Sequence, residues 1–136
     1  MQVTVETTVA APIDEVWRAY TTPGAIVQRN AASADWHTTA ASVDLREGGA
    51  FSSRMEAKDG SQGFDFAGTY TRIEPLRRID YVFGNRHARV DFDETQGGVR
   101  VRVAFDPETT FPVETQQAGW QAILDNFARY VAAQHA

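Results

Sequence analysis

Between residues 42 and 105, apolar and polar side chains alternate in one short segment after another, and this pattern restricts the fold more than any other feature. Residues 99–105, V-R-V-R-V-A-F, show the alternation most clearly. A period of two is that of a β-strand with one buried face. Turn residues such as Asp59-Gly60 separate the segments, as in β-hairpins, and Gly68 inside a segment suggests a bend or a bulge. The pattern predicts an antiparallel sheet with a single apolar face.

Helical periodicity is confined to the two ends of the chain. An alternating strand at residues 2–9 is followed by Pro12, a residue that favours a helix start, and Pro23 ends this first helix. A second, short helix is expected through Val27. Residues 113–134 carry an apolar stripe at helical spacing, and this run exceeds the average helix of ~11–12 residues. The expected order is one strand, two short helices, about six strands and one long helix.

A sheet with one apolar face must be covered, and the long C-terminal helix is the expected element large enough to cover it. A bent sheet with one helix across it need not fill the volume between them. We therefore expect an α+β fold in which a curved antiparallel sheet of about six to seven strands wraps around the helix and encloses a cavity. A chain of 136 residues fits one domain, so we expect residues 1–136 to form a single unit.

Composition narrows the functional classes. The chain has no cysteine, which excludes disulfides, thiolate metal sites and cysteine nucleophiles. Its net charge of −5 gives no general attraction to nucleic acid or anionic membranes, and Arg86 and Arg89 are interpreted as solvated positions on strand faces. No apolar stretch approaches the ~20 residues that span a bilayer, and residues 1–9 lack the pattern of a signal peptide. We expect a cytoplasmic protein without a nucleic-acid partner or membrane insertion.

Residues 43–51, V-D-L-R-E-G-G-A-F, contain the motif D-L-R-x-G-G-x-F and so resemble the Hsp90-ATPase-activator-like family. This family belongs to the START-like, helix-grip superfamily, which also includes polyketide cyclases, aromatases and plant allergens. Further stretches that resemble the family follow in order along the chain: Ala11-Pro12 with Val16-Trp17, residues 55–60, residues 66–70, and Gly119-Trp120 with Leu124. The resemblance implies the helix-grip fold, in agreement with the order of elements expected from periodicity.

Residues 26–30 and 35–38 resemble a bacterial subgroup of this family whose usual patterns are I-V-Q-W-N and D-W-H-T. Arg29 stands where the subgroup usually carries Trp. An arginine at the rim of an apolar mouth would change the polarity of the mouth and pair with an anionic ligand group. The other interpretation is an exposed position of little consequence, and the sequence does not decide between the two.

An aromatic set on the expected inner face is the feature most closely tied to function. A concave, aromatic-lined space with a few polar groups is typical of a small-molecule site. Tyr81 offers a hydroxyl group, and Met55 offers a side chain that adapts to ligand shape. Ordinary core packing is the alternative interpretation for most of the set. The candidate ligand-binding residues are Trp36, His37, Phe51, Met55, Phe64, Phe66, Tyr81, Phe83 and Trp120.

His37 is the candidate for acid–base chemistry, because it follows Trp36 where the cavity should open and because histidine titrates near neutral pH. A histidine bonded to the backbone beside a packed tryptophan is the alternative.

No histidine has a second ligand at metal spacing, so we expect no metal site and no cofactor. Alternation directs Arg54, Glu56 and Asp65 away from the apolar face, which predicts a surface salt bridge; an acid–base pair facing the cavity would require a bulge.

Three functions fit these features. The first is binding of a small hydrophobic or amphipathic molecule in the cavity, with Tyr81, His37 or Arg29 as polar anchors. The second is catalysis of the cyclase or aromatase type, implied by the superfamily, in which the pocket folds a reactive chain and one acid or base assists. The third, a co-factor of an Hsp90-type chaperone, follows from the family name alone. Catalytic residues cannot be assigned from the sequence, and the oligomeric state, a homodimer included, is left open.

Overall fold

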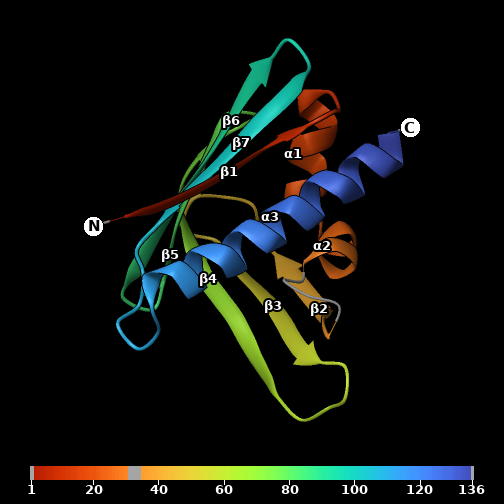
Figure 1. Ribbon diagram of the computed structural model, residues 1–136. Coiled ribbons are helices and arrows are strands. Elements are labelled where there is room, and N and C mark those ends of the chain that lie inside the picture. The colour runs from red at the N-terminus through yellow and green to blue at the C-terminus, as the bar shows by residue number, and fades with distance from the viewer. Residues whose placement is uncertain (1, 31–34, 136) are drawn as a thin grey trace.

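The computed structural model describes residues 2–30 and 35–135, which form one seven-stranded antiparallel sheet and three helices (Figure 1). The strand order across the sheet is β1-β7-β6-β5-β4-β3-β2, so β1 and β2 are the edge strands. The sheet curls around α3, which crosses its face. The predicted α+β helix-grip fold is confirmed. In chain order the elements are β1 (Val3–Val9), α1 (Ile13–Thr21), α2 (Pro23–Arg29), β2 (Trp36–Val43), β3 (Ala50–Ala57), β4 (Gly63–Glu74), β5 (Arg78–Phe83), β6 (Arg86–Thr95), β7 (Gly98–Phe105) and α3 (Val113–His135).

Strand β2 begins at Trp36, well before the start at residue 42 that was predicted from alternation. The pairing of β2 with β3 shifts register between Thr38 and Ala40, and this bulge interrupts the alternation on which the prediction depended. Thr38 is buried, and its hydroxyl donates a hydrogen bond of 2.5 Å to the carbonyl of Asn30. This bond joins β2 to the end of α2 at the edge of the sheet.

The helix α3 is anchored along the opposite edge of the sheet. The side-chain amide of Gln117 donates a hydrogen bond of 3.4 Å to the carbonyl of Thr4. One helical turn later, Gln121 donates a hydrogen bond of 2.9 Å to the carbonyl of Glu6. Both acceptors belong to the edge strand β1, where unpaired backbone groups would otherwise be open to another strand. The two glutamines therefore both cover the edge and position the helix.

Part of the core lies between α3 and the inner face of β1 and β7. Phe105, the last residue of β7, is fully buried and stacks on Trp120 of α3, with ring centroids 4.1 Å apart and planes 7° from parallel. Burial alternates residue by residue along β7, as its valine–arginine pattern predicts. The other large side chains that are fully buried are Val9, Val16, Ile79, Val90, Val99, Val101 and Phe127.

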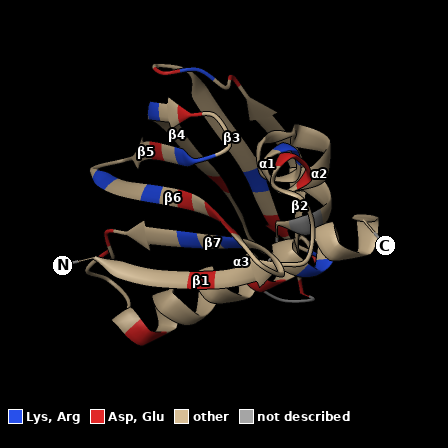
Figure 2. Ribbon diagram, turned by 90° about the horizontal axis from the view of Figure 1, so that it is seen from above, with Lys and Arg blue, Asp and Glu red and all other residues tan. Residues whose placement is uncertain are grey.

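The outer face of the sheet carries ion pairs. Figure 2 shows basic and acidic residues interspersed along the strands. Arg89 Nε lies 3.0 Å from Asp91 Oδ2 on β6. On β3, Arg54 lies 3.2 Å from Glu56, and it lies 3.6 Å from Asp65 on the neighbouring β4. The predicted surface salt bridge is confirmed, and pairs with this exposure each contribute under ~1 kcal/mol.

Gly68 on β4 has no side chain, and the Phe51 ring packs directly against its backbone. It pairs with Phe51 across β3 and β4, and a Cβ atom at Gly68 would lie 2.8 Å from the Phe51 ring and collide with the Val82 carbonyl. The bend or bulge predicted at Gly68 lies instead between Tyr70 and Arg72, where the register with β5 shifts. A close approach of ring and backbone, rather than a bulge, explains the glycine.

Gly68→Ala is expected to destabilise the fold by about 1–3 kcal/mol, because the added methyl group collides with the Val82 carbonyl and overpacks the contact with Phe51. Gly119→Ala on α3 is the control, since nothing lies within 4 Å of the added atom. We expect this control to be neutral or up to ~1 kcal/mol stabilising, because alanine favours a helix over glycine. Urea unfolding measures both variants, and equal stability of the two would contradict the close approach at Gly68.

The carboxylate of Asp106 ties the end of β7 to the start of β6. The backbone N–H of His87 donates a hydrogen bond of 2.8 Å to Asp106 Oδ2, and the His87 ring nitrogen Nδ1 lies 3.3 Å from the same oxygen. The side-chain amide of Gln2 donates to Asp106 Oδ1 at 3.4 Å. These hydrogen bonds, above all the one from the His87 backbone, lower the pKa of the Asp106 carboxyl.

A carboxyl pKa that is lowered by folding stabilises the protein above the unfolded-state pKa of about 4, and this stability is lost as the pH falls through that range. Asp106→Asn removes the charge and keeps the shape of the side chain. We expect the variant to be less stable than wild type near neutral pH, by under ~1 kcal/mol because the carboxylate is partly exposed. The difference should shrink below about pH 4. Urea titrations from neutral to acidic pH measure it, and a difference independent of pH would contradict the assignment.

Candidate ligand-binding cavity

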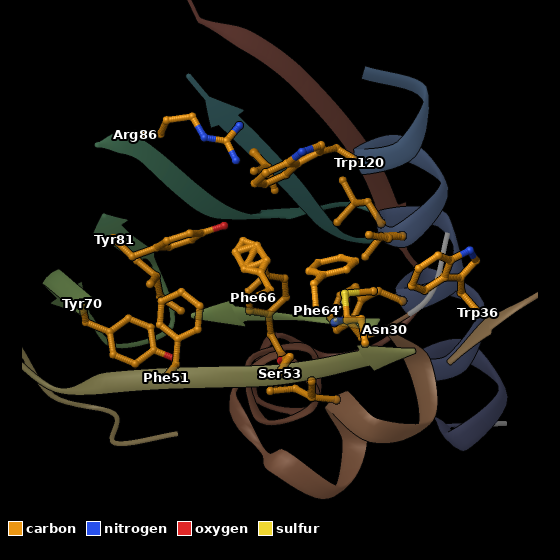
Figure 3. Close-up of a pocket in the computed structure, with 18 residues that line it drawn as sticks. Asn30, Trp36, Phe51, Ser53, Phe64, Phe66, Tyr70, Tyr81, Arg86 and Trp120 are labelled. Carbon is orange, nitrogen blue, oxygen red and sulfur yellow. Dashed lines mark hydrogen bonds between the residues drawn. The ribbon is translucent and has the colours of Figure 1, made fainter. Parts of the chain in front are cut away.

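A cavity of about 480 Å³ lies between the inner face of the sheet and the helices (Figure 3). Side chains from α1, α2, α3 and strands β2 to β7 line it. Its volume is within the ~300–1,000 Å³ range of small-molecule pockets. Most of its lining residues are aromatic or aliphatic, with a few polar groups among them. The expected space between sheet and helix is therefore present.

Most of the residues predicted to line a ligand site surround this cavity. Phe83 is buried one layer behind them, with its ring centroid 5.3 Å from that of Phe66 and 5.8 Å from that of Trp120. It supports the wall without lining the space. The predicted residues that line the cavity are Trp36, Phe51, Met55, Phe64, Phe66, Tyr81 and Trp120.

His37 does not line the cavity. On β2, Trp36 reaches the cavity and Thr38 is buried, so alternation places the exposed His37 between them on the outer face. There it pairs in register with Glu56 of β3, whose side chain belongs to the surface ion pairs. His37, the histidine predicted for acid–base chemistry, is therefore separated from the cavity by the sheet.

Aromatic rings form a continuous wall across the strands to the helix. The Phe51 ring on β3 meets the Tyr81 ring on β5 edge to face, with centroids 5.0 Å apart. Phe66 on β4 lies 5.9 Å from Phe51, and it lies 6.0 Å from Trp120 on α3. Such pairs prefer offset or edge-to-face geometry, and they hold their rings in fixed orientations. At one end of this wall Trp36 lies 5.9 Å from Phe64, whose side chain is 48% exposed.

Sequence reasoning missed polar residues of the lining. Ser53 points into the cavity between Phe51 and Met55, as the period of two required, but it was not assigned to the site. Asn30, at the end of α2, donates from Nδ2 to the Met55 sulfur at 3.8 Å. No local pattern indicated Asn30, because its position depends on the packing of α2 against the β2 edge. Tyr70 of β4 also lines the cavity.

Arg86 is the most consequential residue that was missed. The sequence interpretation placed it on a solvated face together with Arg89, whereas the structure places it in the cavity lining. Counting back in steps of two from the buried Val90 and Ala88 gives Arg86 on the inner face, so the signal was present. The short apolar run and the nearby turn at Gly84 concealed it.

The Arg86 guanidinium is held at the cavity by three neighbours. Its Cζ lies 4.4 Å from the centroid of the Phe83 ring. Its Nη1 donates to the carbonyl of Asp106 at 3.4 Å, and its Nη2 lies 3.9 Å from Glu108 Oε2. Among the described residues that line the cavity, Arg86 alone carries a formal charge, and none is His, Asp or Glu. The side chain of Arg29, for which a role at the mouth was considered, lies outside the described residues.

The described residues contain neither a cluster of metal ligands nor a helix that could span a membrane. They contain no group of three or more His, Asp or Glu side chains placed to hold a metal ion. None of the helices in residues 2–30 and 35–135 has the length and apolar character needed to cross a membrane. The lining supplies ring faces, hydroxyl and amide groups and one cation, which suit recognition of an uncharged or anionic molecule.

Solved structures of similar proteins have the same fold. An AHSA1-like protein from Aeromonas hydrophila is 48% identical, with a TM-score of 0.93, and the match covers 98% of this chain and 94% of that one. A protein from Cytophaga hutchinsonii is 42% identical, with a TM-score of 0.83 and coverage of 98% and 93%. A Chromobacterium violaceum protein at 24% identity shares the fold, with a TM-score of 0.86 and coverage of 97% and 98%.

The comparison with curated proteins finds no match. The family model described as Activator of Hsp90 ATPase homolog 1-like protein matches residues 10–132, which includes every element of the fold except β1 and the last residues of α3. This chain therefore belongs to the family of Activator of Hsp90 ATPase homolog 1-like proteins.

Proposed function

We propose that this protein binds a small hydrophobic or amphipathic molecule in the cavity between the sheet and α3. The observation that carries the proposal is an aromatic-lined space of about 480 Å³ with a few polar groups directed into it. A cavity of this kind provides burial for an apolar body and fixed positions for its polar end. The walls come from Phe51, Phe66 and Trp120, and Tyr81 adds a hydroxyl group.

The size of the cavity argues against a simple packing defect. Protein interiors are packed about as densely as organic crystals, and voids larger than a water molecule are few. A volume of about 480 Å³ is roughly three times the ~150 Å³ of an engineered apolar cavity that stays empty of water. An occupant that binds the folded protein and not the unfolded chain stabilises the folded state.

The lining favours binding over acid–base catalysis. A cyclase or aromatase mechanism that needs a general base requires a titratable group within hydrogen-bond reach of the substrate. The described lining contains no carboxylate and no imidazole, and His37 lies on the other side of the sheet. Shaped-pocket catalysis that relies on the Tyr81 hydroxyl is the version of the enzyme hypothesis that fits the lining. A chaperone co-factor role has the family name as its single support.

Ser53→Leu is the variant that tests occupation of the cavity. Ser53 is buried and lines the space, so a leucine there fills part of it with apolar volume. We expect the affinity for the neutral fluorescent probe N-phenyl-1-naphthylamine to fall about tenfold or more, equivalent to ~1.4 kcal/mol. The thermal midpoint should stay equal or rise, because filling a void is stabilising. Fluorescence titration and thermal unfolding measure the two quantities.

Ser52→Leu is the matched control, because Ser52 is the neighbouring residue on β3 and faces the other side of the sheet. This control should bind the probe as wild type does. Calorimetry and native mass spectrometry with a broad set of lipids and aromatic compounds complete the test. Wild-type affinity in Ser53→Leu, together with no ligand from that set, would refute the proposal.

A further inference from the structure

We propose that the ligand is an organic anion, with a hydrophobic body and one terminal carboxylate, and that Arg86 binds this carboxylate at one end of the cavity. The inference rests on the proposed function and goes beyond it by naming the class of ligand and the residue that selects it. It follows from the position of Arg86, from the state of its hydrogen-bond donors and from the charge distribution around the cavity.

Arg86 marks a charged end of the cavity, and the uncharged end carries the amide of Asn30, which donates to the Met55 sulfur. Figure 3 shows the Arg86 guanidinium and the Tyr81 hydroxyl in the same part of the cavity, whereas Trp36 lies at the opposite side. Phe66 and Trp120 occupy the region between them. A molecule with an apolar body and one polar terminus matches this arrangement, because its body contacts the rings while its terminus reaches Arg86.

The donors of Arg86 are only partly used. A guanidinium carries five N–H donors in one plane, and a carboxylate binds to its edge through two parallel hydrogen bonds. Within the described part of the chain, Arg86 donates one hydrogen bond, to the Asp106 carbonyl, and at 3.4 Å that bond is long. The contact with the Phe83 ring, 4.4 Å from Cζ, involves the face of the guanidinium and uses no N–H group. Donors are therefore left for a ligand.

The nearby acidic groups leave the charge of Arg86 only partly compensated. Glu108 Oε2 is 3.9 Å from Arg86 Nη2, at the outer limit of an ion pair, and both side chains are about one-quarter to one-third exposed. The carboxylate of Asp106 accepts from Gln2 and His87, and it is the carbonyl of Asp106 that faces Arg86. A ligand carboxylate in a two-point contact would form a stronger pair than Glu108 does at this distance.

A purely structural role for Arg86 is the competing explanation. The residue covers Phe83, and its removal would loosen the support behind Phe66 and Trp120. That role predicts equal losses for charged and uncharged ligands, because it acts through the shape of the wall. An anchoring role predicts a loss confined to the carboxylate. Ligand pairs that differ only in this group therefore separate the two explanations.

The experiment compares two such pairs by isothermal titration calorimetry near neutral pH: decanoate with decanamide, and 1-naphthaleneacetate with 1-naphthaleneacetamide. Wild type is expected to bind the carboxylate of at least one pair about tenfold or more tightly than its amide. Arg86→Gln should lose that preference and retain the wild-type affinity for the amide. Raised salt should weaken the binding of the carboxylate more than that of the amide, because Arg86 is partly exposed.

Two variants sharpen the comparison. Arg89→Gln is the matched control, since Arg89 is on the same strand but faces outward, where it pairs with Asp91. It should keep the wild-type preference for the carboxylate. Glu108→Gln removes the competing acid and should raise the affinity for the carboxylate several-fold without changing that for the amide.

Each remaining outcome contradicts a different statement. If wild type binds the amides as tightly as the carboxylates, or if Arg86→Gln weakens both equally, the anchoring role of Arg86 is wrong while cavity binding stands. If Arg89→Gln abolishes the preference as Arg86→Gln does, the selection arises from general surface charge and the assignment is wrong. If neither member of either pair binds and the neutral probe also fails to bind, the proposed function falls and this inference with it.

Discussion

The attachment of α3 to one edge of the sheet is the constraint on which the rest of the structure depends. Strands about 4.8 Å apart make a seven-stranded sheet roughly 30 Å wide, whereas a helix with its side chains is about 10–12 Å across. The glutamines at 117 and 121 and the stack of Trp120 on Phe105 hold α3 near β1. The short helix α2 packs against β2 at the other edge. Aromatic side chains of β3, β4, β5 and α3 enclose the space that remains on the inner face between these two attachments.

The two faces of the sheet differ in polarity. The outer face carries basic and acidic side chains in neighbouring positions, which keeps it hydrated at little net gain in stability. The inner face buries valines under α3 and presents aromatic rings to the cavity. Arg86 is the exception, a cation on the inner face at the start of β6. Glu108 and Asp106 contact this cation at long distances, and the proposal of an anionic ligand rests on that incomplete pairing.

Local periodicity correctly predicted the strands in which buried and exposed residues alternate without interruption. β7 alternates without interruption, so both its boundaries and its buried face were predicted. β2 was placed too late, because a register shift after Thr38 breaks the alternation and because small edge-strand residues carry a weak signal. The same uncertainty at the start of β2 placed His37 near the cavity, whereas one step in a strand moves a side chain to the opposite face.

By itself, the sequence determined the order of the elements, the apolar face of each strand and the aromatic character of the space between sheet and helix. These properties depend on the spacing of apolar residues along the chain, because that spacing decides which face of a strand or helix is buried. Only the tertiary structure decided how far α3 lies from β3 to β5, how large the cavity is, and that Asn30 reaches it. Asn30, Ser53 and Arg86 meet there from α2, β3 and β6 because the curl of the sheet brings distant segments together. Alternation along β3 and β6 indicates that Ser53 and Arg86 face inward, but packing between elements sets their convergence with Asn30 on one cavity.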